Sequence, residues 1–308
     1  MEPNATKKTS SGMLLRIAGT TLTLILLVVL LSQQGWQEIG RAIQQIPIWK
    51  FFLALALMMV SRFAVAGRWH VLLCTANPQI KFLQSLRITF AGLFSTNFLP
   101  TTIGGDVIRL AGAIQLSLDP AFSTASLVVD RLVGMAGMLM VVPFGLPSFF
   151  AANQSQAFSS NTNSIHILGI AVWRERIWNF VNHLFKRFLD AISIWRNRPV
   201  VLLQSLLFSW LHMLCFFGVQ WLLLNGLGES IDFWVVAGLY SLVYFVIILP
   251  FSINGYGLQE VSITFVFSSF GGVSIQNSLT LALLFRTIVM LASLPGAFFV
   301  PGLIRKKI

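Results

Sequence analysis

Apolar runs long enough to cross a bilayer recur along almost the whole of this 308-residue chain. About 20 residues are enough for one crossing. The runs lie at about 13–32, 48–73, 86–113, 121–150, 199–225, 232–250, 258–272 and 277–302. Hydrophobic residues make up 56% of the chain and charged residues 10%, whereas a soluble domain carries about 25% charged residues. The sequence therefore predicts an all-α polytopic integral membrane protein, a single membrane domain over 1–308 with about six to eight transmembrane helices.

The composition also limits the chemistry of the chain. The net charge of +11 is typical of a membrane protein whose basic residues gather in cytoplasmic loops and near anionic lipids, so we expect no nucleic-acid partner. No Walker or Rossmann glycine pattern is present, and the four histidines and two cysteines do not have metal-ligand spacing. We therefore expect no cofactor and a protein that is not an enzyme.

The distribution of basic residues predicts that both chain termini lie in the cytoplasm. The apolar run that begins near the N-terminus is followed by no small-x-small cleavage site, so we expect an uncleaved first helix over 13–32. We expect the second basic group to lie in a cytoplasmic loop. The three groups are Lys7, Lys8 and Arg16; Arg68, Lys81 and Arg87; and Arg305, Lys306 and Lys307.

The segment 172–198 combines helical apolar periodicity with many basic residues. It is either an amphipathic helix in the lipid headgroup layer or a cytoplasmic linker helix packed on the membrane domain. Both interpretations place it on the cytoplasmic side.

Two interrupted segments resemble each other. Residues 97–110 read NFLPTTIGGDVIRL, and residues 248–261 read ILPFSINGYGLQEV. Each contains Leu-Pro, a small hydroxyl residue two positions later, and then Ile, glycine, an acid and Val. Pro250 follows Pro100 by 150 residues, and the same offset superposes the long apolar runs of the two halves. This self-similarity predicts a repeat.

We expect the repeat to comprise 48–150 and 199–302, with the first helix and the basic segment outside it. Charge bias orients the corresponding helices in opposite directions, so the repeat is predicted to be inverted. In that arrangement each interrupted segment is a re-entrant hairpin, and 163–178 supplies a crossing. Eight full crossings would also leave both termini inside, and we favour the inverted version.

The interruptions indicate broken helices. Proline in a helix interior costs about 3 kcal/mol, and broken backbone persists at membrane depth only inside protein or beside a wet cavity. Such breaks at matching positions of two inverted halves indicate a transporter binding site. We therefore predict breaks at Pro100 and Pro250. Asn97, Asn254 and Tyr256 flank these breaks, where they either contact substrate or cap the freed backbone groups.

Several charged residues lie in apolar runs, where an ionised side chain costs about 2.5–3.5 kcal/mol at the bilayer centre. One interpretation is that the arginines hold an anionic headgroup and that the acids position them or relay protons. The other is structural ion pairing, or, for the Asp-Arg pair at 130–131, snorkelling from a helix end. The candidate substrate-binding residues are Asn97, Gly104, Gly105, Asp106, Arg109, Asp130, Arg131, Gly255, Gly257, Glu260 and Arg286.

The order of these motifs resembles a known family. NxLP…GGDxxR is followed by DRLxG, by LPxSxxGxGxxE and by a lone arginine in the last long run. From about residue 48 to the end, this resembles the flippase-like membrane domain of lysylphosphatidylglycerol synthases and its stand-alone relatives. The resemblance implies a protein of the bacterial inner membrane, the plasma membrane, that moves or handles a lipid. It also implies functional positions at the residues named above. The aminoacyl-transferring domain of the full-length enzymes has no counterpart, so we expect no aminoacylation.

We therefore expect translocation of a phosphate-bearing lipid through a polar groove between two inverted halves, with a membrane lipid as the partner. The alternative is a non-transporting accessory subunit of a lipid- or glycolipid-modifying enzyme. A membrane-embedded enzyme with Asp106 or Glu260 as a general base ranks last, because no nucleophile–base pair or metal cluster accompanies these acids.

Overall fold

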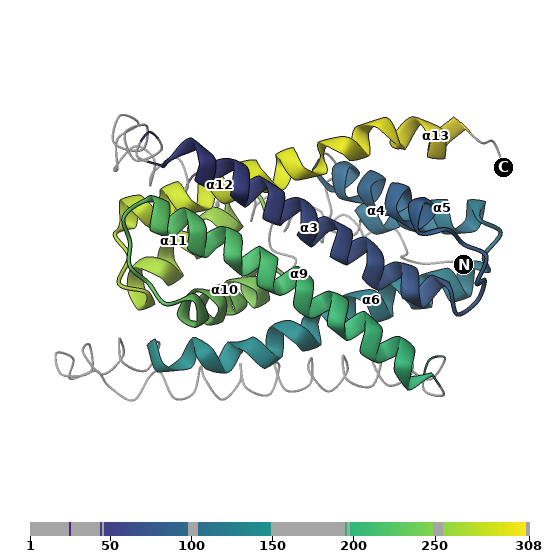
Figure 1. Cartoon of the computed structure of the whole chain (residues 1–308), viewed down its shortest axis with the longest axis horizontal. Coiled ribbons are helices and arrows are strands. Elements are labelled where there is room, and N and C mark those ends of the chain that lie inside the picture. Colours follow the sequence, from purple (N-terminus) through teal and green to yellow (C-terminus); the bar gives the residue numbers. More distant parts are fainter. Residues whose placement is uncertain are drawn as a thin grey trace, which may run out of the picture.

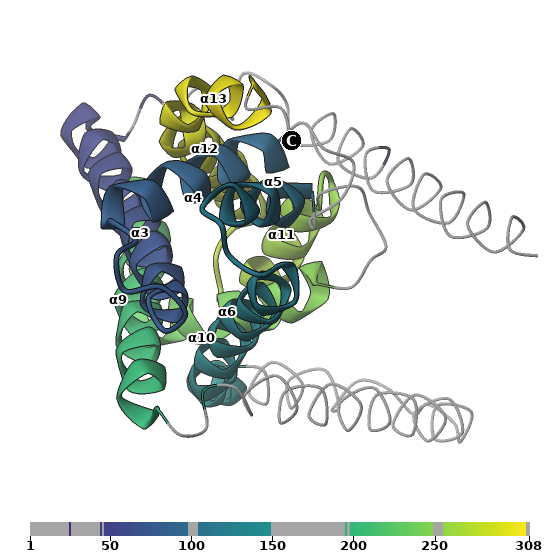
Figure 2. The same ribbon diagram turned by 90° about the vertical axis from the view of Figure 1, so that its right-hand side faces the viewer.

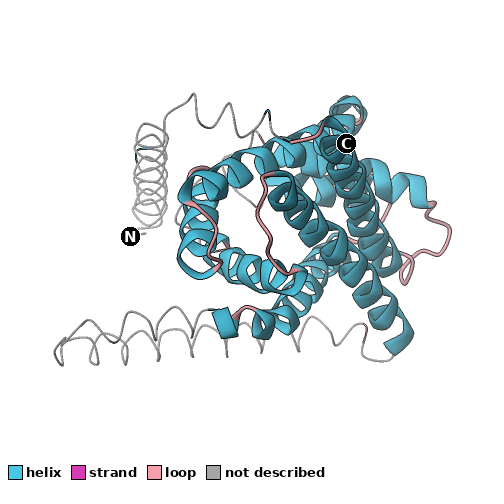
Figure 3. Cartoon of the chain, turned by 60° about the vertical axis from the view of Figure 1, so that its left-hand side comes forward, coloured by secondary structure: helices cyan, strands magenta, loops and turns pink. Residues whose placement is uncertain are grey.

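The computed structural model describes residues 46–97, 104–148, 198–248 and 255–305, together with Ile25, Gln44 and Trp195. Within these ranges the regular structure is helical, without strands (Figure 3). Four of the helices are long and apolar enough to cross a membrane. The chain is thus an all-α polytopic membrane protein, as predicted. Both prolines of the interrupted segments, Asn254, the first helix (apart from Ile25) and the stretch 163–178 lie outside the described residues, as does the basic segment apart from Trp195 and Arg198.

The helices follow the same order in both halves. A long helix is followed by two short helices, a second long helix and a 3₁₀ turn. The first set is α3 (Ile48–Leu73), α4 (Phe82–Thr96), α5 (Gly104–Gln115), α6 (Pro120–Val141) and η1 (Val142–Phe144). The second set is α9 (Pro199–Gly226), α10 (Phe233–Ile247), α11 (Leu258–Phe270), α12 (Ile275–Ser293) and η2 (Leu294–Phe298), and α13 (Val300–Arg305) follows it.

The two corresponding long helices α3 and α9 lie side by side and run in opposite directions (Figure 1). Near the start of α3, Lys50 Nζ donates to the carbonyl of Asn225 near the end of α9. At the other end, Arg198 before α9 donates to the carbonyl of Thr75 just after α3. Antiparallel packing of corresponding helices is the relationship that an inverted repeat requires.

The short helices form two hairpins that enter from opposite ends of the molecule. They contain 12 to 15 residues, so each is about 18–22 Å long at 1.5 Å per residue, against a hydrocarbon core of about 30 Å. Ile80 before α4 and Leu118 after α5 belong to one core cluster. Glu229 before α10 accepts a hydrogen bond from Asn277 at the start of α12. Each hairpin therefore returns to the end from which it came.

Local sequence signals set the boundaries of the long helices that follow the hairpins. Asp119 accepts a hydrogen bond from the backbone of Phe122, and Pro120 occupies the first turn of α6, a favoured position for proline. Ser274 caps α12 in the same way through the backbone of Asn277. These caps follow α5 and α11 closely, so each hairpin leads directly into a spanning helix.

The two halves also exchange contacts beyond their long helices. The 3₁₀ turn that ends each long helix packs on the first hairpin helix of the other half, η1 on α10 and η2 on α4. Glycines allow this approach, because a Cβ on Gly238 would lie 2.0 Å from the backbone of Gly145 and one on Gly296 would lie 2.0 Å from the carbonyl of Phe90. Viewed along the long axis, α3 and α9 lie on one flank, and the helices of the two hairpins occupy the space beside them (Figure 2).

Two expectations are wrong in detail. The run 86–113, which reads as one apolar segment, is divided between α4 and α5. Of the basic group expected in the second loop, Arg68 lies within α3, where only 7% of it is exposed, and Arg87 lies within α4. The sequence does not reveal the helical position of Arg68, because the loop that follows α3 carries the basic residue Lys81.

Candidate functional site

A buried aspartate is the centre of the first charged cluster. Asp130 lies in the middle of α6 and is 1% exposed, so it does not snorkel from a helix end. Its Oδ1 accepts a 2.6 Å hydrogen bond from Arg68 Nε on α3, and its Oδ2 accepts one of 2.9 Å from Arg109 on α5. The two ion pairs join three helices of the first half, and each oxygen of the carboxylate has a cationic donor.

The neighbouring aspartate extends this cluster toward the surface. Asp106 accepts hydrogen bonds from Arg109 at 3.2 Å and from Nε of Arg131. The Asp106 side chain is 17% exposed and that of Arg131 is 41% exposed. These residues form the first charged cluster, which contains three arginines and two aspartates: Arg68, Asp106, Arg109, Asp130 and Arg131. Its pair of Arg68 and Asp130 is buried, and its pair of Arg131 and Asp106 is partly exposed.

Small residues make room for the arginines of this cluster. A Cβ on Gly92 of α4 would lie 2.8 Å from Cγ of Arg109, and a Cβ on Gly134 of α6 would lie 2.9 Å from Nη1 of Arg68. The guanidinium of Arg109 also stacks over the Trp69 ring, with 4.4 Å between Cζ and the ring centroid, within the range of a cation–π contact. The arginines are held on several sides, so their positions are set by packing as well as by charge.

The second charged cluster lies at the break of the second hairpin and consists of Gly255, Tyr256, Glu260 and Arg286. Arg286 Nε donates to Glu260 at 2.6 Å, and its Nη2 donates to the carbonyl of Gly255 at 3.1 Å. Its Cζ lies 4.7 Å from the centroid of the Tyr256 ring. Gly255 and Gly257 have φ angles of +70° and +74°, which glycine adopts without steric cost. Arg286 thus gives a second donor to the Gly255 carbonyl, which also accepts a hydrogen bond from the backbone of Gln259.

The two halves contain one equivalent ion pair each. Asp106 is the third residue of α5, and Glu260 is the third residue of α11. Their partners Arg131 and Arg286 are each the twelfth residue of the long helix that follows. Both arginines bond through Nε. An acid in the first turn of a helix also interacts favourably with the helix dipole, so each pair stabilises the start of a half-helix.

The breaks of the two hairpins touch each other in the interior. The hydroxyl of Tyr256 donates to the carbonyl of Asn97 at the end of α4, over 2.9 Å. The Asn97 side chain donates to Ser293 of α12 over 2.7 Å. In addition, Arg68 of the first charged cluster donates to Ser209 of α9 over 3.2 Å. Each charged cluster therefore has one member, Arg68 or Tyr256, that is hydrogen-bonded to a residue of the other half.

The structure places the other predicted residues as follows. Gly104 and Gly105 are buried at the start of α5, and a Cβ on Gly105 would lie 2.1 Å from Oγ1 of Thr96. They serve the close approach of α4 and α5. Asn97 contacts two side chains of the other half, since its amide donates to Ser293 and its own carbonyl accepts from Tyr256; whether it contacts substrate or caps the broken backbone stays a prediction. All the predicted charged residues are ion-paired, so their direct contact with substrate stays a prediction.

Sequence reasoning missed three polar residues of the interior. The charge pattern places Arg68 in a loop, and the motifs do not single out Arg62 or His212. Ser61 Oγ and His212 Nδ1 are 2.6 Å apart, across the contact of α3 and α9. Only 8% of Arg62 is exposed. The signal was present, since any ionisable residue within an apolar membrane run is a functional candidate.

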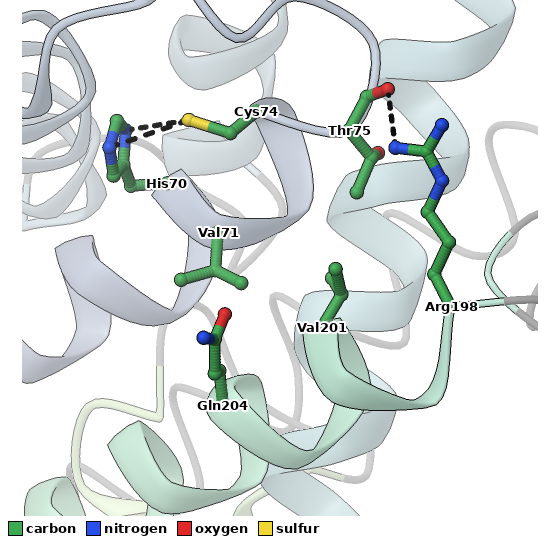
Figure 4. Close-up of a pocket in the computed structure, with 7 residues that line it drawn as sticks. All are labelled: His70, Val71, Cys74, Thr75, Arg198, Val201 and Gln204. Carbon is green, nitrogen blue, oxygen red and sulfur yellow. Dashed lines mark hydrogen bonds between the residues drawn. The ribbon is translucent and has the colours of Figure 1, made fainter.

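A separate pocket of about 230 Å³ lies where the end of α3 meets the start of α9. His70, Cys74, Thr75, Arg198 and Gln204 line it together with two valines (Figure 4). Cys74 Sγ is 3.4 Å from His70 Nε2, and Arg198 donates to the Thr75 carbonyl. The lining residues contain no carboxylate and belong to neither charged cluster.

Among the described residues no group of His, Cys, Asp and Glu could hold a metal ion.

Together, the fold and these clusters define a helical membrane protein with two opposed hairpins whose breaks meet beside buried ion pairs. The chain belongs to the family described as the lysylphosphatidylglycerol synthase TM region, whose model matches residues 15–296. The match includes the first apolar run, which the motifs alone did not cover. This is a lipid-related membrane family without a soluble catalytic domain in the matched region.

One relative comes from an archaeon. The UPF0104 membrane protein PH1989 of Pyrococcus horikoshii is 29% identical over 145 residues, which is 45% of this chain and 40% of that protein. The chain therefore matches less than half the length of this relative, and we infer no activity of this chain from the similarity.

Proposed function

We propose that this chain moves a phosphate-bearing membrane lipid between leaflets, with the headgroup passing through the interior between the two inverted halves. The observation that carries this proposal is the contact of the two hairpin breaks through Tyr256 and Asn97, beside an equivalent ion pair in each half. Opposed half-helices that meet between inverted repeats are the arrangement in which secondary transporters bind substrate. No nucleotide motif accompanies it, so movement would be passive or coupled to an ion gradient.

The balance of charge favours an anionic headgroup. The first charged cluster has one more arginine than aspartate, and its outermost member, Arg131, is partly exposed. Arginine presents a planar fork of donors that suits phosphate geometry. A phosphate that approaches Arg131 would meet net positive charge, and the fully buried pair of Arg68 and Asp130 would hold the cluster in place.

The charges at the two ends favour one orientation. Lys81, Arg87 and Arg198 lie at the end where α3 finishes and α9 begins, and Glu229 and Asp232 lie at the opposite end. Basic loops favour the cytoplasm, so we place the pocket around Cys74 inside and Glu229 outside. With this orientation in a plasma membrane the C-terminus is cytoplasmic. The same bias puts the N-terminus in the cytoplasm.

Headgroup accessibility in proteoliposomes tests the proposal. The purified full chain is reconstituted with fluorescent phosphatidylglycerol, and a membrane-impermeant quencher reports how much lipid remains protected in the inner leaflet. We expect the wild type to remove this protection and Arg131→Gln to slow the loss about tenfold, the effect of one charge-assisted hydrogen bond. Arg87→Gln removes an exposed arginine on α4 and should leave the rate unchanged.

Two results would contradict the proposal. Full lipid movement by a folded Arg131→Gln protein would remove the first charged cluster from the path. If the wild type moves neither phosphatidylglycerol nor other phospholipids, the accessory-subunit hypothesis is favoured, and stable copurification with a lipid-modifying enzyme would support it.

A further inference from the structure

The carboxylate of Asp106 lies between two arginines. Its Oδ1 accepts a 3.2 Å hydrogen bond from Nη1 of Arg109, and its Oδ2 accepts one from Nε of Arg131. The Asp106 side chain is 17% exposed and that of Arg131 is 41% exposed. Two cationic donors therefore converge on the two oxygens of one anion, at the partly exposed end of the first charged cluster.

Arg109 is also held by contacts that do not involve Asp106. Its Nη2 donates to Asp130 over 2.9 Å, and its Cζ lies 4.4 Å from the centroid of the Trp69 ring. These contacts leave Nη1 to the carboxylate of Asp106. They would therefore keep Nη1 directed at the same place if another anion took the position of that carboxylate.

The equivalent carboxylate of the second half has a different environment. Glu260 accepts from Nε of Arg286 through Oε1, and its Oε2 is buried without a hydrogen-bond partner. Arg109 is the sixth residue of α5, and the sixth residue of α11 is Ile263, which is fully buried. Within the described ranges, only the first half thus places a second arginine on the carboxylate of the equivalent ion pair.

We infer that Arg109 and Arg131 bind the phosphate of the lipid, and that the Asp106 carboxylate occupies this place in the empty protein and is displaced by the ligand. A phosphate diester has two unesterified oxygens that share one negative charge, as a carboxylate has, and arginine donors suit both groups. Asp106 is then an internal competitor. It keeps the arginines paired in the absence of lipid, because an unpaired charge in the interior is costly, and it assists release of the phosphate. The assignment rests on the proposed function for the lipid source of the phosphate.

Removal of the Asp106 charge should therefore strengthen binding. Asp106→Asn keeps the size of the side chain, and we expect the dissociation constant of dihexanoyl phosphatidylglycerol to fall about tenfold, the effect of one charge-assisted hydrogen bond. Calorimetric titration of the full chain in neutral detergent, after removal of copurified lipid, measures this constant. Asp106→Ser should do the same, and it decides the question if Asp106→Asn does not fold. Equal or weaker binding would overturn the inference, because it would mean that Asp106 positions the arginines for the ligand.

Two controls separate competition from a general change of charge. Asp119→Asn removes a negative charge from the exposed N-cap of α6, the helix that also carries Arg131. Asparagine caps a helix about as well as aspartate, so the dissociation constant should not change. Glu260→Gln removes the equivalent carboxylate of the second half and should not strengthen binding. A gain in either control as large as that in Asp106→Asn would overturn the assignment to Asp106.

A double variant tests whether the gain depends on the arginines. Arg131→Gln added to Asp106→Asn removes one of the two donors that the phosphate would use, so we expect the tighter binding of Asp106→Asn to be lost. A double variant that still binds dihexanoyl phosphatidylglycerol as tightly as Asp106→Asn would overturn the inference, because the phosphate would then bind elsewhere.

Inorganic phosphate distinguishes the two sources of the ligand. We expect it to bind more weakly than dihexanoyl phosphatidylglycerol, because it lacks acyl chains, and equal affinity would overturn the assignment to a lipid. Tighter lipid binding by Asp106→Asn, in a protein that moves no lipid in vesicles, would support this site while contradicting the proposed function. Lipid movement by the wild type, with binding that Asp106→Asn does not strengthen, would do the reverse.

Discussion

The hydroxyl of Tyr256 donates a 2.9 Å hydrogen bond to the backbone carbonyl of Asn97. This bond joins the break of the second hairpin to the end of α4, beside the break of the first hairpin. The Tyr256 ring also lies against the guanidinium of Arg286. Asn97 reaches Ser293 on the helix that follows the second hairpin. One tyrosine thus connects both breaks and an ion pair, and movement of either hairpin must alter its contacts.

Tyr256→Phe should separate the hydrogen bond from the ring contact. The variant removes the hydroxyl and keeps the ring over Arg286, so we expect a loss of about 1 kcal/mol in the free energy of unfolding. Tyr256→Leu loses the cation–π contact as well, which is worth a further ~0.5–2 kcal/mol. Unfolding midpoints in detergent check this order, and equal midpoints for the two variants would show that the ring contributes nothing.

Asp130→Asn should be the most destabilising of the single changes in the first charged cluster. It leaves Arg68 and Arg109 buried without a counter-charge, and breaking a buried pair in this way costs about 3–5 kcal/mol. The yield of folded protein and its unfolding midpoint in detergent measure the effect. Asp106→Asn is the matched comparison, since the Asp106 side chain is 17% exposed, and it should cost clearly less. A folded Asp130→Asn protein with the wild-type midpoint would mean that the arginines find other partners.

The repeat and its inverted orientation were accessible from the sequence because they rest on local signals. Leu-Pro and the glycines mark both breaks, and charge bias orients the long helices. The lengths of the described hairpin helices agree with the inverted version and not with eight full crossings. The equivalence of Arg131 and Arg286 was not visible at the offset of 150, because the segment after the second break is longer and shifts the later residues.

The partners of the charged residues could not be predicted. Asp106 and Arg109 share a face of one helix, and their contact follows from that spacing. The contact of Arg68 with Asp130 joins residues 62 positions apart and depends on how α3 crosses α6. Gly134 is four residues after Asp130, and its role in admitting the Arg68 side chain follows only from that crossing. Packing between helices, rather than any local pattern, determines these pairs.

Gly105→Ala should destabilise the first hairpin although alanine favours helices. The new Cβ would lie 2.1 Å from Thr96 Oγ1 and 2.6 Å from the carbonyl of Gly92, so α4 and α5 must separate. Overpacking of this kind costs about 1–3 kcal/mol, more than the ~1 kcal/mol that alanine gains over glycine in a helix. Gly302→Ala is the control, because among the described residues no atom outside its own stretch of helix would lie within 4 Å of the added Cβ. Thermal unfolding compares the two, and unchanged stability of Gly105→Ala would show that the hairpin can adjust.

Alkylation of Cys74 should depend on pH in a way that reports its burial. Cys74 directly follows the membrane-spanning part of α3, lies beside His70, and burial raises the pKa of its thiol. Only the thiolate reacts with maleimides, so a raised pKa lowers the reactive fraction at neutral pH. In a Cys215→Ser background we expect the rate to keep rising with pH beyond about 8.5, where an unperturbed cysteine is half ionised. Cys74→Ser, which should not react, is the control, and a rate that levels off at or below that pH would contradict the buried position of the thiol.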